Sequence, residues 1–577
     1  MNEHRNMILA IVLSALVLLG WTMLSDKFLP TPPPQTHEAE NGKTEPAPKP
    51  QAGTVQPQAE PAGTAPPQKM QPRAQVLTQT PRLQIRTASL QGSINLKGAR
   101  FDDLVLLKEK QTIAKDSPPV RLLSPAGAPG AYFATFGWTA QGIQVPTADT
   151  QWTASAPVLE PGKPVTLNWT NPTGQTFQIV VSVDENYLFS VHQRVQNGGS
   201  GPIEVRPYGL VSRAAKSADT SSWTMHVGPM AYLDDAAEYG IDWKDLDGGQ
   251  SKRFTSNGGW LGFTEKYWLT ALAPAGTPQI AANFTGTPGG GYQADYAEGP
   301  QVVPPGGATQ TDTRLFAGAK EKTLLDNYED AGIPKLSKAI DWGWFEWFMR
   351  PIFDLLNWLF HVTGNFGVAI ICLTVIVRLI MFPIAQKQFK SMAAMRKVQP
   401  KLKAIQERFK SDRAKQQQEM LKLYQEEKIN PAAGCLPILL QIPVFYALYK
   451  VLMVSVEMRH QPFALWIRDL SAPDPLTPVN LFGLLNFTPP TFLHIGVLAI
   501  LLGVTQWITF KLNPQQMDPT QQQIFSLMPW VMMFILSPFA AGLLLYWVTN
   551  NILTAAQQWW LYKRFGLHFS DTHPVQS

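Results

Sequence analysis

The stretch VAIICLTVIVRLIMF, Val368 to Phe382, is apolar except for one threonine and one arginine. It lies in the run Asn365 to Ala385, which is long enough to cross the roughly 30 Å hydrocarbon core of a bilayer as a helix. An arginine there costs about 2.5–3.5 kcal/mol on insertion scales, and such residues usually mark functional sites. The sequence therefore predicts a membrane helix with a functional charge at Arg378. The alternative is a side chain that only reaches the nearest head groups.

Other apolar runs predict a polytopic α-helical membrane protein with six transmembrane helices, five of which form a core. The other five runs are Met7–Leu24, Ala433–Ser455, Phe492–Phe510, Ile524–Leu536 and Phe539–Trp560. No convincing cleavage site follows the first run, so we expect an uncleaved anchor rather than a signal peptide. The run Ile524–Leu536 is short and contains Pro529, which indicates either local thinning of the bilayer or a helix with wider bounds.

The basic residues predict the orientation of these helices. The segment 386–429 carries twelve Lys and Arg against five acidic residues, and the C-terminal tail begins with Lys563 and Arg564. Basic loops stay in the cytoplasm, so this segment and the tail are both expected there. Six spans then put both termini in the cytoplasm and the long region after the first span in the periplasm. We expect a multi-pass protein of the cell inner membrane.

The region between the first two spans has two parts. Residues 30–73 are rich in Pro, Gln and Ala, which predicts a disordered linker. From Val165 onward apolar residues alternate with polar ones, and Asn171–Gly174 is a turn signal. Alternation on both sides of short turns predicts a β-meander. We expect residues 74–335 to form a large periplasmic antiparallel β-sandwich domain.

Nothing in this region predicts catalysis. It contains no G-x-S-x-G, H-E-x-x-H or phosphate-loop motif, and the nine His residues of the chain have no metal-ligand spacing. We therefore expect a binding or packing module, not an enzyme, with no catalytic residue, metal or cofactor.

Two segments beside the predicted spans are amphipathic. The aromatic-rich segment 336–364 indicates a helix that lies in the membrane interface, or else an extended start of the second span. In 386–429, Val398, Leu402 and Ile405 follow coiled-coil spacing up to a break at 410–413. This pattern predicts a cytoplasmic helical hairpin, with Pro400 either kinking its first helix or starting it. Its basic face is either a solvated surface or a site for anionic lipids or the ribosome.

Polar residues of the spans are expected to gather on the cytoplasmic side of the bilayer centre. They are Thr374, Gln441, Thr505, Gln506, Asn550, Asn551 and Thr554. The outer halves are expected to be nearly pure hydrocarbon, and no span offers an acidic partner for Arg378. Hydrogen bonding between helices would also use such groups, but it would not confine them to one leaflet. The pattern favours a hydrated groove that opens to the cytoplasm and is closed towards the outside.

The chain resembles the YidC insertases, relatives of the mitochondrial Oxa and chloroplast Albino proteins. The matching stretches are IVRLIMFP (376–383), MAAMRKVQP (392–400), NPAAGCLP (430–437), QIPVF (441–445) and GLLLYWVTN (542–550). The resemblance implies that Arg378 and Thr374 are the groove arginine and threonine of the family. A groove aromatic that is often Tyr is here Trp547, which leaves a role for a hydroxyl at that position in doubt.

The resemblance implies a membrane protein insertase and chaperone that acts alone or with the Sec translocon. Its expected partners are nascent membrane proteins, the Sec translocon, anionic lipids and the ribosome. The expected parts are an anchor (1–29), the linker (30–73), the sandwich (74–335), the interfacial helix (336–364), the core (365–565) and a cytoplasmic tail (566–577). The alternatives are a transporter or channel for a small solute, which would need a polar path through both leaflets, and a periplasmic scaffold with mere anchors.

Overall fold

The structure is a computed structural model, and it describes residues 70–564 except 222–224, 288, 411, 428–435, 483, 486, 488–494 and 513–518. These residues all belong to one compact unit, residues 57–577. The predicted anchor (1–29), nearly all of the linker (30–73), Cys435 and the tail (566–577) lie outside the described residues.

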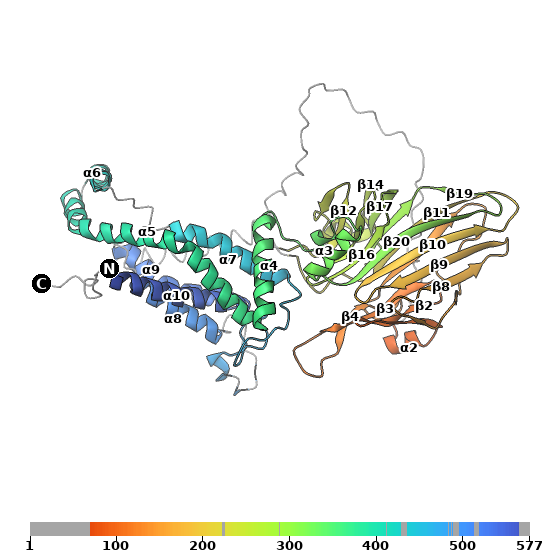
Figure 1. Cartoon of the computed structure of the whole chain (residues 1–577), viewed down its shortest axis with the longest axis horizontal. Helices are drawn as coiled ribbons and strands as arrows, with labels where there is room; N and C mark the ends of the chain where they lie inside the picture. The colour runs from red at the N-terminus through yellow and green to blue at the C-terminus, as the bar shows by residue number, and fades with distance from the viewer. Residues whose placement is uncertain are drawn as a thin grey trace, which may run out of the picture. The chain divides into compact units, whose positions relative to one another are not determined.

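Two large sheets form the region predicted to be a sandwich (Figure 1). The first sheet contains β1 Arg82–Arg86, β2 Leu90–Asn95, β3 Arg100–Lys110, β4 Pro119–Leu123, β5 Tyr132–Ala140, β7 Val158–Leu159, β11 Ile203–Arg213, β14 Ser251–Asn257, β17 Gln279–Gly286, β18 Tyr292–Glu298 and β19 Gln301–Val303. The second contains β6 Thr153–Ala154, β8 Val165–Thr170, β9 Gln175–Val183, β10 Leu188–Asn197, β12 Gly228–Leu233, β13 Ala236–Glu238, β15 Trp260–Thr264, β16 Trp268–Pro274 and β20 Ala308–Ala319.

The meander expected from residue 165 onward is confirmed. Strands β8, β9 and β10 pair antiparallel in sequence order. In β9, buried and half-buried residues alternate along the whole strand, because successive side chains point to opposite faces. One strand pair departs from the expected antiparallel pattern: β1 and β7 are parallel. Since β7 has only two residues, this pair adds little to the sheet.

Aromatic side chains from both sheets pack against one another in the core. The ring of Phe101 on β3 lies 5.5 Å from that of Phe189 on β10, and Trp138 on β5 lies 5.2 Å from Phe177 on β9. Both contacts are edge-to-face, a favourable geometry for aromatic pairs. The two sheets therefore share one dry interior, which is the observation that makes the region a sandwich-like domain.

Short helices flank the sheets. They are α2 Arg73–Leu77, the 3₁₀ turns η1 Trp243–Asp245 and η2 Asp247–Gly249, α3 Lys322–Asp330 and the 3₁₀ turn η3 Leu336–Ala339. The indole of Trp260, which is fully buried, donates a 3.0 Å hydrogen bond to the carbonyl of Pro334, and so ties the chain after α3 to the second sheet.

The aromatic segment forms a helix of its own, α4 Glu346–Thr363. Gly364 ends it in the left-handed conformation, at φ 69°, which glycine adopts without steric cost. The helix buries one side, including Met349, and exposes Trp347 and Trp358. An extended start of the second span is therefore wrong, while the interfacial position stays a prediction.

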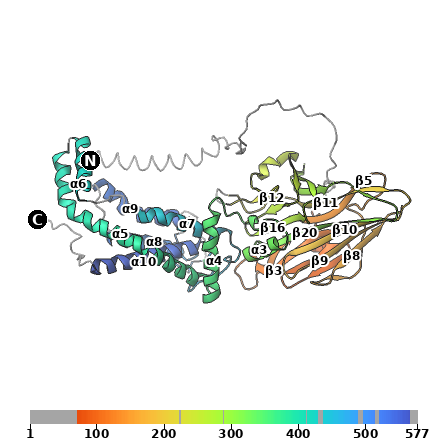
Figure 2. The same cartoon turned by 45° about the horizontal axis from the view of Figure 1, so that its top comes forward.

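Helix α5 Phe366–Arg408 joins the second predicted span to the first arm of the hairpin without a break (Figure 2). The helix has no end at residue 386, so the boundary between span and hairpin stays a prediction, and Pro400 lies inside the helix and does not start it. The second arm, α6 Arg413–Glu426, packs through Leu423 against Val398 and Leu402, as the spacing predicted. Asp412 caps α6 by accepting a 3.1 Å bond from the Lys415 N–H.

The other long helices are α7 Leu436–Val454, α8 Val497–Leu512, α9 Pro519–Leu536 and α10 Ala541–Arg564, and a 3₁₀ turn, η5 Pro478–Asn480, precedes α8. Helix α10 packs between α5 and α8, and α9 packs against α8 (Figures 1 and 2). Among the described residues, one helix segment, Phe366–Phe389, is both long and apolar enough to cross a membrane. Gln441–Val454, Val497–Leu512 and Ser526–Leu536 are shorter apolar helices, so the count of six spans stays a prediction.

Helix α9 has wider bounds than the run Ile524–Leu536 indicated. It begins at Pro519 and includes polar residues before the apolar part starts at Ser526. The apolar part is still short, so the wider helix does not by itself supply a full-length span.

Candidate functional site

Helix α10 positions most of the polar contacts of the helical core. Arg378 on α5 reaches across to it: its Nε donates a 2.8 Å hydrogen bond to the side-chain oxygen of Asn550. One terminal nitrogen donates to the Asn550 carbonyl at 3.2 Å and also to the Thr554 hydroxyl. Among the described residues no ion pair involves Arg378, and the partners of its hydrogen bonds, Asn550 and Thr554, are uncharged.

Two more hydrogen bonds hold polar residues against α10. Asn551 donates to the Thr505 hydroxyl on α8 at 3.1 Å, and Gln441 on α7 donates to the Tyr546 hydroxyl. Asn550 and Asn551 are neighbours in sequence, so their side chains leave α10 about 100° apart and meet different helices. The last helix thus connects α5, α7 and α8 through polar groups.

Three of the residues singled out from the sequence have other surroundings. The Thr374 hydroxyl is 1% exposed and donates to the Ile370 carbonyl of its own helix at 2.7 Å. The half-buried Trp547 ring packs edge-to-face on Phe445, 4.6 Å between ring centres. The side-chain oxygen of Gln506 is buried and has no hydrogen-bond partner among the residues that the structure describes. Five of the eight residues take part in the polar bonds that join α10 to other helices. They are Arg378, Gln441, Thr505, Asn550 and Asn551.

The N-terminal end of α10 is packed differently. Leu543 and Leu544 there are no more than 1% exposed, as are Leu448 on α7 and Leu502 on α8. The backbone amides of Ala541 and Gly542 donate to the carbonyls of Ala472 and Leu470 at 2.8 and 2.9 Å. Polar contacts with Arg378 begin only two turns further along α10. One half of the helix is therefore sealed by apolar packing, and the other half carries the polar residues.

The sequence reasoning missed two features of this region. Tyr546 belongs to a quoted motif, but it was not singled out, although residues 546, 550 and 554 recur every four positions and so share one face of α10. Lys450 near the end of α7 has a side chain that is 1% exposed. Its Nζ lies 3.6 Å from a carboxylate oxygen of Asp341, which precedes α4. The expectation of nearly pure hydrocarbon in the outer halves of the spans is wrong at this residue.

The described residues contain no group of three or more His, Cys, Asp or Glu arranged to hold a metal. What the polar residues of α10 offer is a half-buried positive charge and several amide and hydroxyl groups. Such an arrangement can bind and orient a polar or acidic group by hydrogen bonds, and it supplies no nucleophile aligned with a general base.

Two family matches cover the chain from β1 to its C-terminal part. Residues 82–355 match the family described as YidC periplasmic domain, and residues 358–567 match the one described as 60Kd inner membrane protein. The chain belongs to the YidC family of membrane protein insertases. The resemblance found in the sequence motifs is thereby confirmed, and the family is one of inner-membrane proteins with a periplasmic domain.

Relatives named as membrane protein insertase YidC match over nearly the whole length. The protein from Zymomonas mobilis is 46% identical over 98% of this chain and 96% of its own length. That from Bradyrhizobium diazoefficiens is 41% identical over 98% of this chain and 97% of its own length. A solved structure described as an active YidC insertase with its first transmembrane domain resolved covers 83% of this chain and 94% of its own, at 21% identity and a TM-score of 0.36.

Proposed function

We propose that this YidC-family chain inserts nascent proteins into the inner membrane through a hydrated groove beside α10, and that it assists their folding. The observation that carries this proposal is the division of α10 into an apolar half around Leu544 and a polar half around Asn550. With α10 running from outside to inside, the polar half faces the cytoplasm. The groove then admits water from that face only.

Arg378 is the proposed receptor for the incoming chain. Its bonds to Asn550 and Thr554 orient the guanidinium without neutralising it, because both partners are uncharged. At an effective dielectric constant near 20, a carboxylate about 6 Å from this charge gains about 3 kcal/mol. An acidic or polar flank of a nascent protein is therefore attracted part-way into the bilayer, which lowers the cost of moving polar groups through hydrocarbon.

The apolar segment of the substrate supplies the driving force. Burial of apolar surface in lipid contributes about 25 cal/mol per Å², so a segment of about 20 residues needs no nucleotide hydrolysis to partition. We propose that it leaves along the outer faces of α7 and α9. Both helices expose apolar side chains, among them Ile442 on α7 and Phe534 and Ile535 on α9.

The remaining parts have supporting roles in this proposal. Residues 1–29 anchor the chain, 30–73 link it to the periplasmic domain 74–335, and the helix in 336–364 lies in the membrane interface through Trp347 and Trp358. Both termini and the hairpin 386–429 are cytoplasmic. The basic hairpin and the tail (566–577) contact the ribosome or anionic lipids, and the chain works alone or beside the Sec translocon.

Reconstitution tests this function directly. The purified chain in liposomes is expected to insert a short single-span model protein, scored by protease protection, and Arg378→Ala is expected to slow this insertion. Liposomes without the chain are the control. Unchanged insertion together with altered flux of a small solute would instead indicate a transporter.

A further inference from the structure

The connection between α7 and α8 carries an apolar turn that no described part of the protein covers. Leu484 is 84% exposed, and its neighbours Leu481, Phe482, Leu485 and Phe487 are all between 46% and 54% exposed. A cluster of this kind on one short turn marks a surface that meets lipid or another protein. We infer that Leu481, Phe482, Leu484, Leu485 and Phe487, called the apolar turn below, insert into the outer leaflet and contact its acyl chains.

The backbone of the apolar turn is suited to such a place. The amides of Leu481, Phe482 and Leu485 donate to carbonyls of residues 478, 477 and 480 at 3.0, 2.9 and 3.0 Å. Those of Leu484 and Phe487 donate to carbonyls inside the turn at 3.3 and 2.9 Å. Because lipid offers no hydrogen-bond partners, a segment that enters it must satisfy its own backbone groups. Every described amide of this turn is satisfied in this way.

The backbone of the turn is strained at two residues. Leu481 and Phe482 both have positive φ, 51° and 58°, which is uncommon for residues with large side chains. Strain of this kind persists where the surrounding structure requires it. Here it leaves both apolar side chains about half exposed, whereas the preceding Thr477 is fully buried and caps the 3₁₀ turn.

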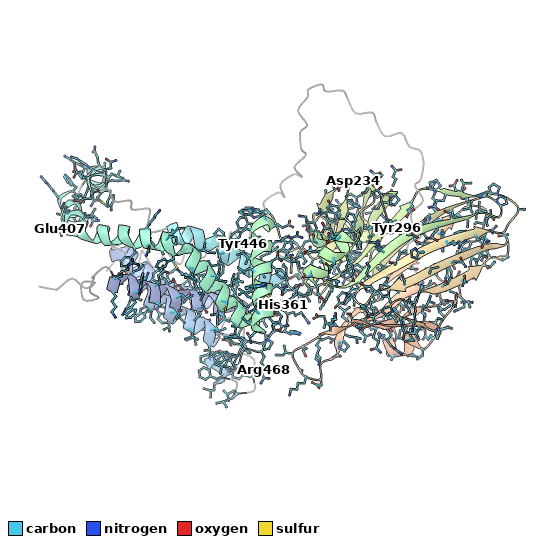
Figure 3. All side chains as sticks on the ribbon, viewed as in Figure 1. Asp234, Tyr296, His361, Glu407, Tyr446 and Arg468 are labelled. Atoms are coloured by element: carbon cyan, nitrogen blue, oxygen red, sulfur yellow. The ribbon has the colours of Figure 1, made fainter. Side chains whose placement is uncertain are left out.

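The part of the connection that precedes the turn is fixed to the end of α8. Asp474 accepts a 2.8 Å bond from the Leu498 amide, and the Val497 amide donates to the Leu476 carbonyl at 3.0 Å. The chain carries no Asp, Glu, Lys or Arg between Asp474 and Lys511, so the cost of burying such a charge in lipid does not arise there. Arg468, labelled in Figure 3, lies on the same connection but before this uncharged stretch.

The length of α8 explains why lipid is the expected occupant. Its 16 residues span about 24 Å, which is less than the roughly 30 Å of the hydrocarbon core. Its exposed apolar residues Leu501 and Val504 face outward within two turns of the end that carries the apolar turn. We place the apolar turn in the part of the outer leaflet that α8 does not reach. The inference rests on the proposed topology, which puts this end of α8 outside.

Depth measurements in proteoliposomes test the inference. In the full-length chain with Cys372 and Cys435 replaced by alanine, single cysteines at Leu484, Ile535 and Val302 carry a nitroxide label. Ile535 on α9 is 58% exposed and is the reference for lipid, whereas Val302 on β19 is 68% exposed and is the reference for water. Collision rates with oxygen, which concentrates in lipid, and with a water-soluble nickel chelate are then compared at each site.

The label at 484 is expected to match the one at 535, with oxygen collisions exceeding those of the nickel chelate. A label that behaves like the one at 302 would overturn the inference, because the turn would then be in water. Protection from both reagents would overturn it as well, since a protein partner or a second copy would cover the turn. Leu484 lies outside the groove. If either of these two results is found and insertion activity is normal, the inference about the turn is wrong but the proposed function is not contradicted.

Discussion

Replacing Asn550 by Asp changes the charge beside Arg378 and almost nothing else. The two side chains have the same shape, and the new carboxylate would keep the acceptor that now lies 2.8 Å from the Arg378 Nε. Asn550 is 8% exposed, so the new pair would be largely desolvated. The variant Asn550→Asp thus neutralises the proposed receptor charge without removing a hydrogen bond.

The expected size of the effect follows from the distances. An incoming carboxylate about 6 Å from the guanidinium gains about 3 kcal/mol at an effective dielectric constant near 20. The carboxylate at position 550 would lie about 9 Å from the incoming carboxylate and would repel it by about 2 kcal/mol at the same dielectric constant. About 1 kcal/mol of attraction remains. The lost attraction of about 2 kcal/mol corresponds to a roughly thirtyfold lower occupancy of the groove.

The assay compares two substrates in proteoliposomes. One single-span model protein has an acidic flank, and a matched version has Asn in place of each Asp. Asn550→Asp is expected to slow insertion of the acidic substrate by more than tenfold and to leave that of the neutral one nearly unchanged. Equal rates for Asn550→Asp and the unaltered chain on the acidic substrate would refute the role of the Arg378 charge.

Three other substitutions test the account outside the groove, each followed by pulse proteolysis of the full-length chain in detergent. Asp474→Ala removes the carboxylate that caps α8 and accepts three bonds, so we expect a loss of about 3 kcal/mol, and Asp474→Asn should lose less. Burial raises the pKa of Asp295 to about 6, so the folded domain binds a proton more tightly than the unfolded chain. As the pH rises from 4 to 7, the free energy of unfolding should therefore fall by up to about 3 kcal/mol. The non-titrating Asp295→Asn should abolish this loss, and a pH dependence equal to that of the unaltered chain would contradict the assignment. Gly318→Val would bring a methine carbon within 2.2 Å of the Tyr187 ring, so we expect destabilisation by about 1–3 kcal/mol, with Gly318→Ala less affected.

The local patterns of the sandwich and the hairpin were predictable from the sequence. Phe177, Ile179 and Val181 are buried at every second position because a strand has a period of two. The pairing of Val398 and Leu402 with Leu423 follows in the same way from the spacing of apolar residues on a helix. In both cases a periodic pattern determines which face is buried, and the partner is a near neighbour in the chain.

Features that depend on distant partners were not predictable. Nothing in the residues near Lys450 indicates that Asp341, more than a hundred positions earlier, pairs with it. The uninterrupted course of α5 through Pro383 and Pro400 also contradicts the local rule that proline breaks helices. The polar residues Arg378 and Asn550 were grouped by their expected depth in the membrane, but the bond between them depends on how α5 and α10 pack.

The water accessibility of two positions distinguishes a groove that opens to one side from a dry core and from a pore. In a chain without other cysteines, Gln506→Cys lies next to Thr505, which is bonded to Asn551, and Leu544→Cys lies among the apolar residues. A membrane-impermeant maleimide is added to vesicles of either orientation. We expect the cysteine at 506 to react from the cytoplasmic side only and the one at 544 to react from neither side. Reaction of both cysteines from both sides would indicate a continuous pore, and no reaction at 506 would indicate a dry core. Either result would contradict the proposed groove.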